Sequence, residues 1–162
     1  MPIKSALKNQ YRASLTMLYE VIDGCPPELW ADAAHRNPYW RVAYHTLYYA
    51  HLYLMQSETE FVPWEHHRPG ANRLGAPPDP SNPVTPYSVE ELRGYCRYCI
   101  GIVDVAVDRL DLSSPESGYS WYQMPKLEHQ LVNLRHVEHH TGQLAERLRR
   151  TADRGLAWVK GA

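Results

Sequence analysis

This 162-residue sequence has few cysteines and no long apolar run. None of its apolar stretches approaches the roughly 20 residues of a membrane-spanning helix, and residues 1–15 lack the apolar segment of a signal peptide. The three cysteines, Cys25, Cys96 and Cys99, are too few, and odd in number, for a disulfide framework, which agrees with a reducing compartment. We therefore expect a soluble, cytoplasmic protein with free thiols.

The sequence also lacks an excess of charge of either sign. It has 17 basic and 18 acidic residues, for a formal net charge of -1. Such a balance offers no general electrostatic attraction to nucleic acid or to an anionic membrane, so we expect neither as a partner. A chain of this length is large enough to bury a core and is expected to form one domain, residues 1–162.

What the sequence does have is four segments with the spacing of amphipathic helices. They cover residues 4–22, 37–56, 88–110 and 124–151. Asn37 can cap the second helix, with Pro38 in its first turn, and proline also opens the fourth helix at Pro125. The third begins with S-V-E-E, in which Ser88 and Glu91 have the spacing of a capping box.

Between the second and third helices lies a segment too rich in proline to be helical. Seven prolines fall between residues 61 and 87, at positions 63, 69, 77, 78, 80, 83 and 86. Trp64, His66, His67 and Arg68 at its start would suit a lid, and a plain crossover connection is the alternative. Four helices with one extended connection predict an all-α protein, a four-helix bundle with a long proline-rich connection between helices 2 and 3.

Three histidines are the candidate metal ligands. His136 and His140 are four residues apart on the fourth helix, so their side chains are neighbours on one face. His45 lies in the apolar second helix, and packing of the two helices would bring it to the pair. Three imidazoles around one divalent ion leave a coordination position open, as in catalytic zinc sites. The alternative is that His45 is an ordinary core histidine and that His136 and His140 are half-buried and hydrated.

The helical wheel separates the remaining histidines from this group. His129 lies on the same stripe as His136, two turns earlier, and could line the pocket, support a ligand or lie at the surface. His139 points away from the apolar arc and is expected to be exposed. His51 is rotated by about 120° from His45 and is not a predicted ligand. Cys96 and Cys99 in C-R-Y-C are expected to pack in the core of the third helix rather than to act in redox chemistry.

Two segments resemble the DinB superfamily, in particular its DinB-like and YfiT-like metalloenzymes. They are W-x-x-x-x-H from Trp40 to His45 and L-E-H-Q-L-V-N-L-R-H-V-E-H-H-T-G-Q-L from Leu127 to Leu144, which closes with H-x-x-x-H and G-Q-L. The resemblance implies a four-helix bundle that holds a divalent ion, commonly zinc or nickel, through His45, His136 and His140. It also implies a homodimer, and an activity such as thiol transfer with bacillithiol, mycothiol or glutathione, isomerisation with mycothiol, or hydrolysis.

The chemistry common to these activities is activation of a nucleophile. A three-histidine ion can hold a thiol as its thiolate, or lower the pKa of a water molecule that then attacks a carbonyl carbon. Glu128, Glu138, His129 and Tyr48 are candidates for moving the proton. We therefore expect a metal-dependent transferase or hydrolase that acts on a small electrophilic substrate. The alternative is a non-catalytic protein that binds a metal or a ligand, in which a fourth residue such as a glutamate or His129 closes the site.

Overall fold

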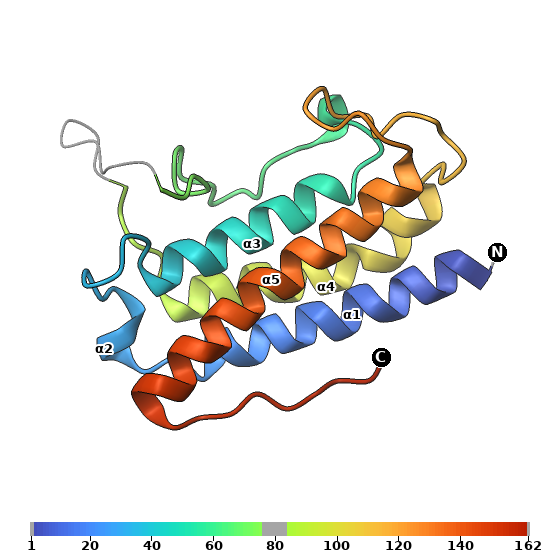
Figure 1. Ribbon diagram of the computed structural model, residues 1–162. Helices are drawn as coiled ribbons and strands as arrows, with labels where there is room; N and C mark the ends of the chain where they lie inside the picture. Colours follow the sequence, from blue (N-terminus) through green and yellow to red (C-terminus); the bar gives the residue numbers. More distant parts are fainter. Residues whose placement is uncertain (1, 76–83, 162) are drawn as a thin grey trace.

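The structure is a computed structural model that describes residues 2–75 and 84–161, and it is all-helical over these residues (Figure 1). The elements are α1 (Pro2–Asp23), α2 (Pro27–Trp30), α3 (Tyr39–Tyr53), the 3-10 turn η1 (Glu58–Glu60), α4 (Val89–Arg109) and α5 (Lys126–Ala152). The all-α prediction is confirmed, and the four long helices occupy the four predicted segments. The short helix α2 was not predicted. Within the described ranges, no helix is both long and apolar enough to cross a membrane.

The predicted helix starts are confirmed at α4 and partly wrong at α3. At α4, the Ser88 side chain accepts the N–H of Glu91, and the Glu91 carboxylate accepts the N–H of Ser88, which completes the capping box. At α3, Asn37 does not cap the helix, because its side-chain oxygen accepts the N–H of Gly75 instead. The helix also ends three residues before the predicted Gln56, at Tyr53.

The four long helices pack side by side around one core (Figure 1). Helix α1 packs against α4 and α5, and helix α3 packs against the same two helices. The core contains large side chains from all four helices, among them Tyr11, Leu15, Leu18, Leu47, Tyr95, Val103, Val137 and Leu144. All three cysteines are free, as predicted, and the predicted core positions of Cys96 and Cys99 are confirmed. Cys25 is buried as well.

The face that α5 turns towards α3 is more polar than the sequence pattern predicted. Gln130 and Asn133 are completely buried, and their amide groups donate to the backbone oxygens of Tyr53 and Ala50, at 2.9 and 3.2 Å. The last carbonyls of a helix have no partner within it, so these two amides satisfy the end of α3. Leu131 of α5 is 56% exposed.

The connection between α3 and α4 lies against the helices that it joins, as far as it is described. Trp64 stacks on Tyr95 of α4 with ring centroids 4.5 Å apart, and His67 Nδ1 lies 2.6 Å from the Tyr44 hydroxyl of α3. Arg68 pairs with Glu91. These contacts favour the plain crossover over the lid for residues 64–68. The prolines at positions 77, 78, 80 and 83 lie outside the described residues.

Candidate metal centre and its cavity

The structure brings together the three histidines that the sequence singled out. His45 comes from α3, and His136 and His140 come from successive turns of α5. One nitrogen atom from each ring can be chosen so that all three lie within 4.8 Å of one another. The ring centroids form a nearly equilateral triangle, with sides of 5.0, 4.8 and 4.7 Å. Three side chains arranged in this way could hold a metal ion.

Hydrogen bonds at the far side of two rings determine which nitrogen faces the centre of the triangle. His45 Nδ1 lies 2.7 Å from the backbone oxygen of Asn72, and His140 Nδ1 lies 2.9 Å from Oε1 of Gln143. Because both oxygens can only accept, each Nδ1 carries the hydrogen, and each Nε2 of the neutral ring keeps its lone pair. Such outer partners orient metal-binding histidines and make them better ligands. For His136, Nδ1 is buried and has no hydrogen-bond partner.

The surroundings keep these imidazoles neutral, which is the form that binds metal ions. Burial, opposed in part by the Asn72 hydrogen bond, lowers the pKa of His45 from 6.5 to about 4. Burial, and then the proximity of His45 and His140, lowers the pKa of His136 to about 3. The pKa of His140 is lowered as well, mainly by burial. At neutral pH each ring is therefore uncharged and has one unprotonated nitrogen.

The spacing of the nitrogens fits a single ion. In a tetrahedral site with zinc–nitrogen distances of 2.0 to 2.1 Å, ligand nitrogens are about 3.4 Å apart. The Nε2 atoms of His45 and His136 are 3.0 Å apart, slightly closer than this, so small side-chain rotations would accommodate an ion. Among the described residues, no fourth histidine, cysteine or carboxylate joins the group. The donor set is thus three neutral nitrogens, which suits zinc, nickel, copper or iron.

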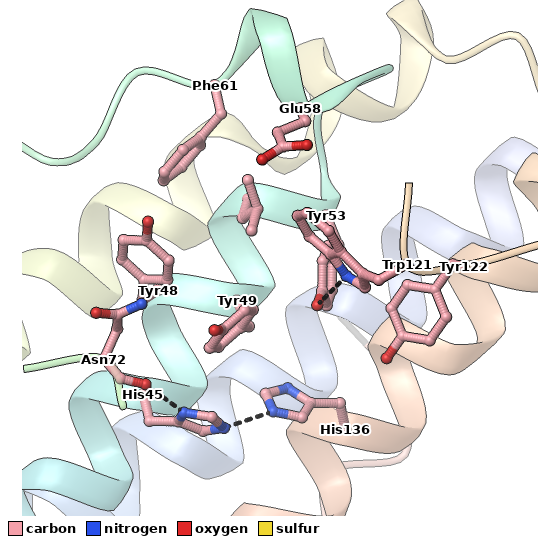
Figure 2. A pocket seen from close by; sticks show the side chains of 11 residues that line it. His45, Tyr48, Tyr49, Tyr53, Glu58, Phe61, Asn72, Trp121, Tyr122 and His136 are labelled. Carbon is pink, nitrogen blue, oxygen red and sulfur yellow. Dashed lines mark hydrogen bonds between the residues drawn. The ribbon is translucent and has the colours of Figure 1, made fainter. Parts of the chain in front are cut away.

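His45 and His136 open onto a large aromatic cavity (Figure 2). Its volume is about 650 Å³, within the usual range for small-molecule sites. The other lining residues are Tyr48, Tyr49, Leu52, Tyr53, Glu58, Phe61, Asn72, Trp121 and Tyr122. His140 is not among the lining residues and is 9% exposed. The histidines lie at one end of the cavity, and Glu58 and Phe61 lie at the other.

Much of the cavity wall comes from loops that sequence patterns do not assign to a site. Trp121 and Tyr122 precede α5, and Glu58 and Phe61 follow α3. A close backbone contact holds these two loops together: the N–H of Glu58 donates to the Gly118 oxygen at 3.1 Å. In the sequence, these two loops are marked as part of a site only by their aromatic residues. Aromatic residues are equally typical of a protein core.

The other histidines are separate from the metal-binding group. His139 is exposed and His51 is buried against Tyr95, at 3.1 Å from its hydroxyl, so both predictions are confirmed. His129 is fully buried between the rings of Tyr53, Tyr119 and Tyr122, and neither of its nitrogens has a hydrogen-bond partner. It does not line the cavity and does not join the ligand group.

Of the proton-transfer candidates, only Tyr48 reaches the cavity. Burial, and then the charges of Tyr49 and Glu58, raises the pKa of its hydroxyl, so Tyr48 stays protonated at neutral pH and can donate a hydrogen bond. Glu128 is exposed and Glu138 is half-buried, and neither lines the cavity. Among the described residues that line the cavity, Glu58 carries the single carboxylate.

Comparison with known proteins finds no match: no family model, no curated protein and no solved structure matches this chain. The function of the site must therefore be inferred from its own residues and their geometry.

Proposed function

We propose that this protein is a metal-dependent enzyme, a thiol S-transferase or a hydrolase, that acts on a small electrophilic substrate. The observation that carries the proposal is the three-histidine group at one end of an aromatic cavity. An open coordination position is what distinguishes catalytic from structural metal sites, and the group contains no fourth protein ligand among the described residues. The cavity next to it provides room for a substrate.

The residues of the chain have distinct roles in this proposal. His45, His136 and His140 hold the ion, and the Asn72 carbonyl and Gln143 orient two of these rings. A divalent ion held there supplies a positive charge that stabilises a thiolate or lowers the pKa of a water molecule. The aromatic walls bind the body of the substrate and exclude bulk water. The Tyr48 hydroxyl donates a hydrogen bond to the developing negative charge of the substrate.

The resemblance to the DinB superfamily supports the same activity. The residues of its two motifs include all three histidines of the group. We extend the proposal accordingly to a DinB-type four-helix bundle, to zinc or nickel as the ion, and to a low-molecular-weight thiol such as bacillithiol, mycothiol or glutathione as the co-substrate. A homodimer that forms through the long helices belongs to the same proposal.

Elemental analysis tests the metal centre directly. The untagged protein, purified without chelators, is compared with His45→Ala, His136→Ala and the control His35→Ala, which removes an exposed histidine outside the metal-binding group. We expect about one zinc or nickel ion per chain in the native protein and in the control, and little in the other two variants. No ion in the native protein, even after zinc or nickel is supplied, would overturn the proposal.

The activity itself is tested with thiols and electrophiles. The metal-loaded protein is mixed with glutathione or another low-molecular-weight thiol and with an electrophile such as 1-chloro-2,4-dinitrobenzene, while activated esters test for hydrolysis. We expect turnover that is lost with the metal and is retained in His35→Ala. If the ion binds stoichiometrically but no substrate is consumed, the protein is instead a metal- or ligand-binding protein of the same fold.

A further inference from the structure

Acidic and basic side chains are unevenly represented in the described lining of the cavity. Of the eleven described residues that line it, Glu58 alone carries a carboxylate. No lysine or arginine lines the cavity in the part of the chain that the structure describes. Its electrostatic potential is therefore unfavourable for an anionic ligand at the end that contains Glu58.

The carboxylate of Glu58 is available to a ligand. Within residues 2–75 and 84–161 it forms no ion pair, whereas the acidic residues Asp23, Asp104, Asp108 and Glu91 each pair with a lysine or an arginine. Its backbone is held in place by the hydrogen bond to Gly118. In Figure 2 the carboxylate lies beside the ring of Phe61, at the end of the cavity away from the histidines.

Aromatic rings cover the walls between this carboxylate and the histidines. They are those of Tyr48, Tyr49, Tyr53, Phe61, Trp121 and Tyr122. The faces of such rings attract cations, and rings combined with a carboxylate are the usual recognition surface for an ammonium group. The Trp121 side chain is 48% exposed, so one wall remains accessible from solvent.

We propose that the cavity selects an elongated, mostly apolar substrate that carries an ammonium group, which the Glu58 carboxylate and the neighbouring rings bind. The position of the reacting group at the histidine end rests on the proposed function. Substrates with a carboxylate in place of the ammonium group are disfavoured.

Three probes of the same size and different charge test the selection: 4-phenylbutylammonium, 4-phenylbutanol and 4-phenylbutyrate. Their affinities are measured by calorimetry at pH 7 and low ionic strength, with native protein and with Glu58→Gln. The matched control is Glu60→Gln, which neutralises a carboxylate of the same turn that does not line the cavity. Both glutamates are exposed, so both variants should fold, and circular dichroism checks this.

We expect the ammonium to bind native protein and Glu60→Gln about fivefold more tightly than the alcohol, and the carboxylate to bind least well. In Glu58→Gln the preference for the ammonium should fall below about twofold. Equal or tighter binding of the alcohol or the carboxylate by native protein would overturn the inference. The inference would also be overturned if Glu58→Gln left the preference for the ammonium unchanged. Failure of all three probes to bind at millimolar concentration would overturn it as well.

Running each titration with metal-loaded and with chelator-treated protein separates this inference from the proposed function. A protein that binds no metal but prefers the ammonium through Glu58 would overturn the metal-dependent activity and leave the ammonium site in place. Because a carboxylate can also coordinate the ion, the preference is judged on chelator-treated protein. A protein that binds one ion per chain but prefers the carboxylate after chelator treatment would support the metal centre and overturn the ammonium site.

Discussion

The Nε2 atoms of His45 and His136 lie 3.0 Å apart, although 91 residues separate the two histidines in the sequence. The packing of α3 against α5 makes this contact. In a protein core, two imidazoles that face each other and lack an ionised partner are both kept neutral by desolvation. The pair is therefore uncharged, as a divalent ion requires, and small side-chain rotations would bring the two nitrogens to the separation of metal ligands.

Removal of His136 should release the metal without unfolding the protein. The core of the four long helices contains many large apolar side chains that do not touch the histidine group, so the ion is not needed to define the fold. For His136→Ala we expect loss of most bound metal and an unchanged helical circular dichroism spectrum. A parallel loss of helix and metal would instead make the ion structural.

Gln143 should strengthen metal binding although it is not a ligand. Its Oε1 accepts from Nδ1 of His140, which keeps Nε2 of that ring free for the ion. We expect Gln143→Ala to weaken metal affinity about tenfold in competition with a chromogenic chelator. Gln143→Glu retains an acceptor at this position and should retain native affinity. Because Gln143 is exposed, stability should not change in either variant. Equal affinities for Gln143→Ala and native protein would refute this role.

The buried imidazole of His129 should make the protein less stable in weak acid. Burial, and then the charge of Lys126, lowers the pKa of His129 from 6.5 to about 4. Between these pH values the unfolded chain binds a proton that the folded protein does not, so stability falls as pH decreases from 6.5 towards 4 and is unaffected by this group above 6.5.

Denaturant unfolding of metal-free protein measures this effect. His129→Gln has no titrating group at this position, so its free energy of unfolding should fall less steeply than that of native protein between pH 6.5 and 4. The native protein should lose up to about 1.4 kcal/mol more than the variant for each pH unit in this range. Parallel curves for the two proteins would show that His129 titrates normally.

Gly118 should be necessary for the loop contact that positions Glu58. Its φ is 84°, and an added Cβ would lie 2.2 Å from the backbone oxygen of Gln56. We expect Gly118→Ala to cost about 2 kcal/mol or more of unfolding free energy. The control is Gly101→Ala on the exposed side of α4, where a Cβ meets no atom within 4 Å and should stabilise the helix by up to about 1 kcal/mol. Equal stabilities of the two variants would contradict this account of Gly118.

Cys99 should contribute to packing and not to the metal centre. Its side chain is fully buried in the core, and burial raises the pKa of its thiol well above 9.0, so it stays protonated and unreactive. For Cys99→Ala we expect a loss of about 1 kcal/mol in thermal or chemical unfolding and an unchanged metal content. A loss of metal in this variant would mean that the cysteines were wrongly assigned to the core.

The positions of the long helices could be predicted because their signals are local. The capping box at Ser88 and the apolar periodicity of the four segments act within a few residues, and the structure places helices there. Asn37 could not be predicted correctly, because a distant backbone group, the N–H of Gly75, competes for its side chain.

The sequence by itself determined which residues could bind a metal: His136 and His140 share a helix face through their spacing, and His45 lies in a helix that is apolar almost all round. Only the tertiary structure decided that the three rings meet, that the Asn72 carbonyl orients one of them, and that Glu58 lies at the far end of an aromatic cavity. The reason is physical. Helix formation depends on interactions within one or two turns, whereas a cavity depends on how helices and loops far apart in the chain pack against one another.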